Sequence, residues 1–171
     1  LKAAPQNDVP TISFDQTSYS TDEDVALTGV SFDIGDKETA VESLLLAGKS
    51  SDTALIPTDG IVLTNNGDGT CSMTITPAED ANGSAVVTIT VSDGVANSQA
   101  TFTVSVAAQE DAPVATNDNV YVPLSGKRVF AVLNNDHDVD GDSLTVTDYE
   151  ETLAGTLTFD EATQKFTYYA A

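Results

Sequence analysis

The stretch most able to do chemistry reads NNDHDVDGDSL and carries alternating aspartates at Asp136, Asp138, Asp140 and Asp142. Carboxylates so closely spaced repel one another in water at neutral pH, unless a cation lies among them. Calcium takes six to eight oxygen ligands at about 2.3–2.6 Å, whereas zinc prefers histidine and cysteine. The chain has one histidine and one cysteine, far apart in sequence. The stretch therefore predicts either a calcium site or a solvated acidic turn.

An EF-hand is a poor match for the same residues. The spacing of Asp136, Asp138 and Asp140 before Gly141 imitates the start of an EF-hand loop. Its later positions fail, because Ser143 stands where an apolar residue is expected and Thr147 where the bidentate glutamate belongs. The flanking segments also have the composition of strands, whereas an EF-hand needs helices.

The charge balance narrows the class of partner. The chain has 171 residues, with 27 acidic and 6 basic side chains and a net charge of −21. This balance disfavours nucleic acid and anionic membranes and favours a divalent cation. The longest apolar run, Leu44–Ala47, is far too short to cross a bilayer. The lone Cys71 excludes a disulfide within the chain, and the start at Leu1 suggests a piece of a longer protein.

A tandem repeat of roughly 100 residues accounts for the length. Residues 3–10, AAPQNDVP, resemble residues 107–113, AAQEDAP, and Asp33–Asp36 resembles Asp138–Asp142 at nearly the same offset. We expect a linker over 1–8, a first domain over 9–108, a second linker over 109–113 and an incomplete second domain over 114–171. A domain lacking its last strands should be mobile or pair with another molecule.

Short alternating segments rich in Val and Thr predict an all-β fold. Ser92-Asp93-Gly94 is a hairpin signal, and Cys71, alternating with Met73 and Ile75, is expected in the core. Val41–Gly48 has a helical composition in a β context and is taken as a strand. The expected strands otherwise include 70–75, 86–91 and 100–106, then 119–122, 128–133, 143–148, 153–159 and 165–169. Strands of this length and spacing predict immunoglobulin-like Greek-key sandwiches in tandem.

The sandwich topology predicts where the acidic loops gather. Alternate loops lie at the same end, so one end of the first domain should collect Asp22-Glu23-Asp24, Glu79-Asp80 and the linker Glu110-Asp111. Asp138 and Asp140 of the second domain should face them. The other end of the first domain should collect Asn7-Asp8, Asp33, Asp36 and Asp93. Each group is a candidate cation site.

The run LNNDHDVDGDSLTV at residues 133–146 resembles the L-x-N-D-x-D-x-D-G-D-x-L-x-V motif of bacterial cadherin-like repeats. These repeats occur in large secreted adhesins and repeats-in-toxin type surface proteins. PAEDANG at 77–83, followed by VSDG at 91–94, resembles the second half of the same repeat. Members bind calcium between domains, and the resemblance implies that role for Glu23, Glu79, Asp80, Glu110, Asp111, Asp138 and Asp140.

Three functions remain open at this point. The first is a calcium-stiffened stalk segment of an extracellular adhesin, non-enzymatic, whose partners are neighbouring repeats and a cell-surface glycan or protein. The second is a carbohydrate- or ligand-binding module that recognises its ligand through calcium or through the aromatic group Tyr149, Phe166, Tyr168 and Tyr169. The third is an accessory domain of a secreted enzyme. An exposed aromatic platform would favour the second function, and buried aromatic side chains would disfavour it.

Overall fold

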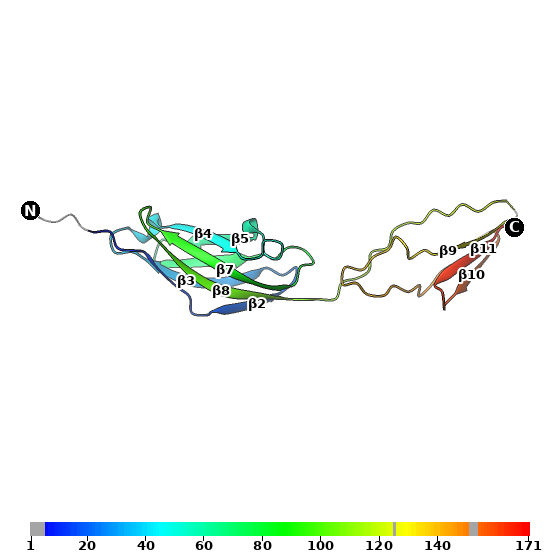
Figure 1. Ribbon diagram of the computed structural model, residues 1–171, viewed down its shortest axis with the longest axis horizontal. Coiled ribbons are helices and arrows are strands. Elements are labelled where there is room, and N and C mark those ends of the chain that lie inside the picture. The colour runs from blue at the N-terminus through cyan, green and yellow to red at the C-terminus, as the bar shows by residue number, and fades with distance from the viewer. Residues whose placement is uncertain (1–5, 125, 151–153) are drawn as a thin grey trace, which may run out of the picture. The chain divides into compact units, whose positions relative to one another are not determined.

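The computed structural model describes residues 6–124, 126–150 and 154–171. The chain divides into two compact units, unit 1 (Leu1–Gln109) and unit 2 (Glu110–Ala171), and Figure 1 shows the strands of each. Each unit is described by itself below.

Unit 1 is a sandwich of two four-stranded sheets, ordered β1-β3-β6-β5 and β2-β8-β7-β4. Its strands are β1 (Thr11–Ser13), β2 (Ser18–Asp22), β3 (Leu27–Gly35), β4 (Leu45–Ser50), β5 (Ile61–Asn65), β6 (Thr70–Ile75), β7 (Gly83–Ser92) and β8 (Asn97–Ala107). Short 3-10 helices, η1 (Val41–Ser43) and η2 (Thr58–Gly60), precede β4 and β5. The all-β, immunoglobulin-like prediction is confirmed.

Alternation along the strands builds the core of unit 1. In β6, Cys71, Met73 and Ile75 are buried while the residues between them are more exposed, as the two-residue period of a strand requires. The opposite sheet supplies inward residues such as Val87 and Ile89 from β7. Burial raises the pKa of the Cys71 thiol, which agrees with its predicted place in the core.

The hairpin prediction is also confirmed. Strands β7 and β8 pair antiparallel from Gly83↔Val106 to Ser92↔Asn97, and Gly94 in the connecting turn has a φ of 90°. The segment Val41–Gly48 is a 3-10 turn followed by a strand from Leu45, so the strand prediction holds for its second half.

Unit 2 has one three-stranded sheet among its described residues, ordered β10-β11-β9. The strands are β9 (Lys127–Phe130), β10 (Thr156–Asp160) and β11 (Lys165–Tyr169). Phe166 is buried against Phe130, Tyr149 and Phe159, with ring centroids 5.8, 5.1 and 4.8 Å from its own. These four rings form the aromatic cluster of unit 2.

Two strand predictions in unit 2 are wrong. Residues 119–122 and 143–148 form no described strand, and 128–133 is a strand only as far as Phe130. A strand needs a hydrogen-bonded neighbour, and the described residues provide none for these segments. Strand 165–169 is confirmed, and β10 covers the described part of 153–159 except for its first residues. No helix among the described residues is long and apolar enough to cross a membrane.

Candidate cation-binding groups

Unit 1 carries a buried carboxylate just after β2. Glu23 is only 3% exposed, and its backbone N–H donates to the carbonyl of Ala107 at the end of β8, at 2.9 Å. One carboxylate oxygen accepts the backbone N–H of Gln109 at 2.5 Å, and the other accepts the side-chain amide of Asn82 at 3.3 Å. The carboxylate of Glu23 therefore holds the point at which the chain leaves the sandwich.

Two aspartates are connected to this residue: Asp24 follows Glu23 in sequence, and Asp80 is hydrogen-bonded to Asp24. The backbone N–H of Asp80 donates to the side chain of Asp24 at 3.1 Å. Asp24 and Asp80 have φ angles of 59° and 52°, a left-handed conformation that aspartate tolerates better than most residues. We call Glu23, Asp24 and Asp80 the Glu23 group. Glu79, predicted with them, is exposed.

In unit 2 the aspartate stretch folds around Asp138. One oxygen of Asp138 accepts the backbone N–H groups of Asp140 at 3.0 Å and Asp142 at 3.5 Å. Gly141 completes the turn with a φ of 81°. The loop is tied to the linker, since the N–H of Asp111 donates to Asp140 at 2.7 Å. We call Glu110, Asp111, Asp138, Asp140 and Asp142 the Asp138 group.

The residues just before this loop are hydrogen-bonded to the segment at residues 114–116. Asp136 accepts the backbone N–H of Thr116 at 2.7 Å. His137 is exposed and exchanges backbone hydrogen bonds of 2.8 and 3.1 Å with Val114. The backbone bridge to Val114 therefore accounts for its position between aspartates.

The N-terminal end of unit 1 gathers only part of its predicted set. Asp93 accepts the amides of Val95 and Ala96 and the side chain of Asn7, at 2.7, 2.6 and 2.8 Å, and these bonds, that from Ala96 first, lower its pKa. Asp36 accepts the N–H groups of two residues that follow it. Asp33 lies exposed within β3, in register with Ser13 and Thr70, and makes no side-chain hydrogen bond to the others among the described residues.

The hydrogen bonds also correct the register of the repeat. Asp36 accepts the amide two residues onward, from Glu38, as Asp138 does from Asp140. The N–H of Asp8 donates to Glu38 as that of Asp111 donates to Asp140. Asp36 and Glu38, rather than Asp33 and Asp36, therefore correspond to Asp138 and Asp140. Counting acids from the first aspartate missed this, because Asp33 belongs to a strand.

Several residues of these groups were absent from the predicted site set. Asn82, Gln109 and Glu38 all take part in the contacts above. Asp24 and Asp142 belong to the predicted acidic loops, although the resemblance did not imply them as ligands. Glu38 follows Asp36 at the two-residue spacing of Asp138 and Asp140. Nothing in the sequence marks Asn82 or the backbone of Gln109.

The acidic groups lack basic partners within their own units. Among the described residues, one salt bridge is formed, between Lys37 and Asp8. Within either unit taken alone, no three described carboxylates bring oxygens within 4.8 Å of one another. Neither group is thus neutralised by the protein, and neither is a complete cation site by itself.

Repulsion within the Asp138 group acts most clearly on Glu110. The charge of Asp142, then that of Asp140, raises the pKa of Glu110 above its ordinary value. The folded state thus holds this proton more tightly than the unfolded state does. The contribution of Glu110 to stability is therefore lost as pH rises from its ordinary pKa through the raised one.

We expect Asp142→Asn to lower the pKa of Glu110, because it removes the largest source of repulsion. An NMR titration of the Glu110 side-chain carboxyl carbon in chelator measures the change. Lys49→Met in unit 1 serves as the control and should leave the titration unmoved. An unchanged Glu110 titration in Asp142→Asn would contradict the proposed repulsion.

Residues 7–106 and 110–171 match the family described as "Bacterial Ig domain". No curated protein matches the sequence. Among solved structures, domains 4 and 5 of the S-layer protein SbsC are 22% identical, with 63% of this chain and 55% of that chain covered and a TM-score of 0.45. An endo-fucoidan hydrolase of glycoside hydrolase family 107 is 18% identical, with 99% of this chain and 25% of that chain covered and a TM-score of 0.48.

The chain thus spans about half of the SbsC fragment and about a quarter of the hydrolase. Titin domains Z1Z2, solved in complex with telethonin, are 15% identical, with 99% and 83% of the two chains covered and a TM-score of 0.44. At such identities the likeness concerns the fold alone.

Proposed function

Because the chain belongs to the bacterial Ig-domain family, matched in tandem over 7–106 and 110–171, we propose that it is a structural segment of an extracellular surface protein. In this proposal calcium stiffens the connection between consecutive domains, as in the stalk of an adhesin. The proposed role is mechanical, without catalysis. The partners are neighbouring repeats of the same protein, and a cell-surface glycan or protein is the target that such a stalk would reach.

The buried carboxylate of Glu23 carries this proposal. Burying an ionised carboxylate is costly unless a positive charge or several hydrogen bonds offset the lost hydration. Glu23 is 3% exposed and has two hydrogen bonds, but no basic partner among the described residues of unit 1. A cation would supply the missing charge.

Covalent continuity supports placing that cation at the linker. Glu23 accepts the N–H of Gln109, and the next residues, Glu110 and Asp111, belong to the Asp138 group. Gln109, which Glu23 holds, is therefore joined by a peptide bond to Glu110, the first residue of the Asp138 group. We propose that Glu23, Asp24, Asp80, Glu110, Asp111, Asp138 and Asp140 provide the oxygen ligands, with Glu79 at the margin.

The chemistry of the ligands favours calcium. Carboxylate and backbone oxygens suit a hard cation with a flexible coordination shell, and extracellular modules bind calcium with Kd values of about 10⁻⁴ to 10⁻³ M. A site with such a Kd is filled at the calcium concentration outside cells and is empty at that of the cytosol. Without the ion the carboxylates repel, and the linker is free to bend.

The aromatic group of the carbohydrate-binding alternative is divided between the interior and the surface of unit 2. Phe166 is buried, and the ring of Tyr149 packs against Phe159 and Phe166 at 5.7 and 5.1 Å. Tyr149 and Tyr169 are nevertheless 43% and 44% exposed, so the burial of Phe166 disfavours this function only in part.

Thermal unfolding in chelator and then in 10 mM calcium tests the proposal. Binding to the folded state should contribute about 1.4–2.7 kcal/mol at that concentration for the Kd range above. The melting temperature should rise by roughly 3–10 °C. Small-angle scattering should show a narrower range of chain dimensions with calcium.

Magnesium at the same concentration is the control, because it prefers a rigid octahedral shell and retains its waters. Asp138→Asn should lower the calcium response. Equal rises with both ions, or no rise, would mean that the acidic groups are ordinary solvated turns.

A further inference from the structure

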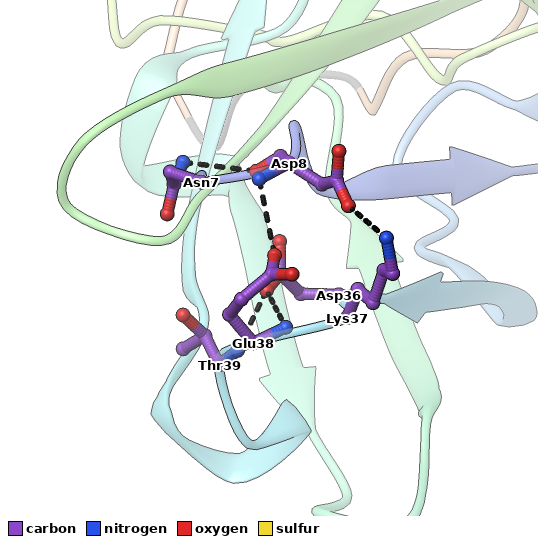
Figure 2. Close-up of polar contacts among 6 residues, drawn as sticks. All are labelled: Asn7, Asp8, Asp36, Lys37, Glu38 and Thr39. Carbon is purple, nitrogen blue, oxygen red and sulfur yellow. Dashed lines mark hydrogen bonds and ion pairs between the residues drawn. The ribbon is translucent and has the colours of Figure 1, made fainter. Parts of the chain in front are cut away.

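The two units present similar loops that differ in charge, because Lys37 stands in the place of Val139 and Ala40 in the place of Asp142. In unit 1, one oxygen of Asp36 accepts the N–H groups of Glu38 and Thr39 at 2.9 and 2.6 Å, and the N–H of Asp8 donates to Glu38 at 3.0 Å (Figure 2). The Asp138 loop of unit 2 repeats two of these bonds, from Asp140 to Asp138 and from Asp111 to Asp140, whereas the N–H of Gly141 donates to the backbone carbonyl of Asp138. The residue between the two acids is Lys37 in unit 1 and Val139 in unit 2.

Lys37 uses its charge within the loop. Its ammonium group lies 2.6 Å from a carboxylate oxygen of Asp8, and Figure 2 shows it reaching back to the segment that enters β1. The hydrogen bond to Asp8, and then the charges of Asp8 and Glu38, raise the pKa of Lys37. The lysine is therefore fully charged at neutral pH.

We propose that Lys37 is a covalently attached counter-ion that closes the Asn7–Asp8 segment onto the loop at residues 36–39, so that this corner needs no divalent cation. The contrast with a calcium-dependent Asp138 group rests on the proposed function above. Junctions built from the same loop would then differ in their dependence on calcium, according to the residue between the two acids.

The alternative to the lysine is a divalent cation bound at Asp36. Asp36 Oδ2 is buried and has no hydrogen-bond partner among the described residues. A divalent cation binding there, as the sequence predicts for Asp36, would compete with the lysine for the same acids. The response of the Asp8 and Thr39 amides to calcium separates the two cases.

Amide exchange measured by NMR on the whole chain is the test. In chelator, Lys37→Met should speed exchange at the Asp8 amide by about two- to fivefold, the range expected for an exposed ion pair. Lys49→Met removes an exposed lysine that has no acidic partner among the described residues, and it should leave Asp8 unchanged. An Asp8 exchange rate that is the same in Lys37→Met and in the wild type would overturn the inference.

Calcium is then added to the wild-type chain. We expect the Asp8 and Thr39 amide resonances to stay in place, and a shift of either with a saturating calcium dependence would overturn the inference. The Asp111 and Asp140 amides report separately on the proposed function. If they too stay in place, the calcium stalk fails, while the exchange in chelator still decides the role of Lys37.

Discussion

Phe102→Ala should lower the unfolding free energy of unit 1 by about 3–5 kcal/mol, the cost of removing a large buried ring and leaving a cavity. Phe102 is 2% exposed on β8, an interior strand of its sheet. Its ring lies 5.0 Å from that of Phe14 and 5.2 Å from that of Tyr19. These contacts join two sequence-distant segments to the centre of the sandwich.

Urea denaturation followed by circular dichroism measures this loss. Thr101→Ala, at the neighbouring exposed position of β8, is the matched control and should change stability by less than about 1 kcal/mol. Since a domain of this size has a total unfolding free energy of about 5–15 kcal/mol, Phe102→Ala removes a large part of it. A loss below about 1 kcal/mol would mean that the core collapses around the gap.

The sequence was most informative where one face of a strand is buried by a partner within the same unit. Cys71, Met73 and Ile75 alternate because one face of β6 packs into the core shared with the opposite sheet, and their pattern located the strand at its observed bounds. The same reasoning found β11, where Phe166 is the buried member. In both strands the alternation reflects a packing contact that exists.

The same pattern misled where a partner is lacking. Residues 143–148 alternate as regularly, and they follow the Asp138 loop as β4 follows the loop at residues 36–39. In unit 1, β4 pairs with β7. The described part of unit 2 has no strand in the place of β7, so Leu144 and Val146 are only partly covered. The periodicity of a segment predicts that one of its faces is apolar, whereas a strand also needs a neighbouring strand to hydrogen-bond with.

For the candidate site, composition identified the acidic loops but could not show which of their carboxylates are buried. Burial singles out Glu23 from its acidic neighbours, and burial depends on the end of β8 and on the Gln109 backbone, distant in sequence. The register of the first loop was missed because Asp33 and Asp36 differ only in being inside and after β3. Tertiary position, rather than residue type, decides which carboxylate is buried and which lies on a strand.

Glu23→Gln should affect the stability of the folded protein in opposite directions in chelator and in calcium. Glutamine keeps the shape of the side chain and an oxygen that can accept the Gln109 N–H. In chelator the variant should therefore match or exceed the wild-type stability, within about 1 kcal/mol, because the substitution removes a buried carboxylate that has two hydrogen bonds but no basic partner among the described residues. In calcium it should be the less stable protein.

The loss of stability in calcium follows from the proposed role of Glu23 as a calcium ligand. Removing a buried carboxylate should weaken calcium binding by roughly ten- to a hundredfold or more, since even partners of ligands cost that much. At 10 mM calcium most of the wild-type stabilisation then disappears, because the Kd approaches or passes the ion concentration. Calorimetric binding and thermal unfolding measure the two quantities independently.

Glu42→Gln is the matched control, because Glu42 is an exposed glutamate of the same unit, within η1. It should leave both the calcium response and the stability in chelator unchanged. If Glu23→Gln were destabilised in chelator and kept the full calcium response, the carboxylate would serve only to hold the Gln109 backbone. If the stability effect changes sign for Glu23→Gln and not for Glu42→Gln, the buried carboxylate destabilises the ion-free protein. Its charge would then be balanced by a bound cation.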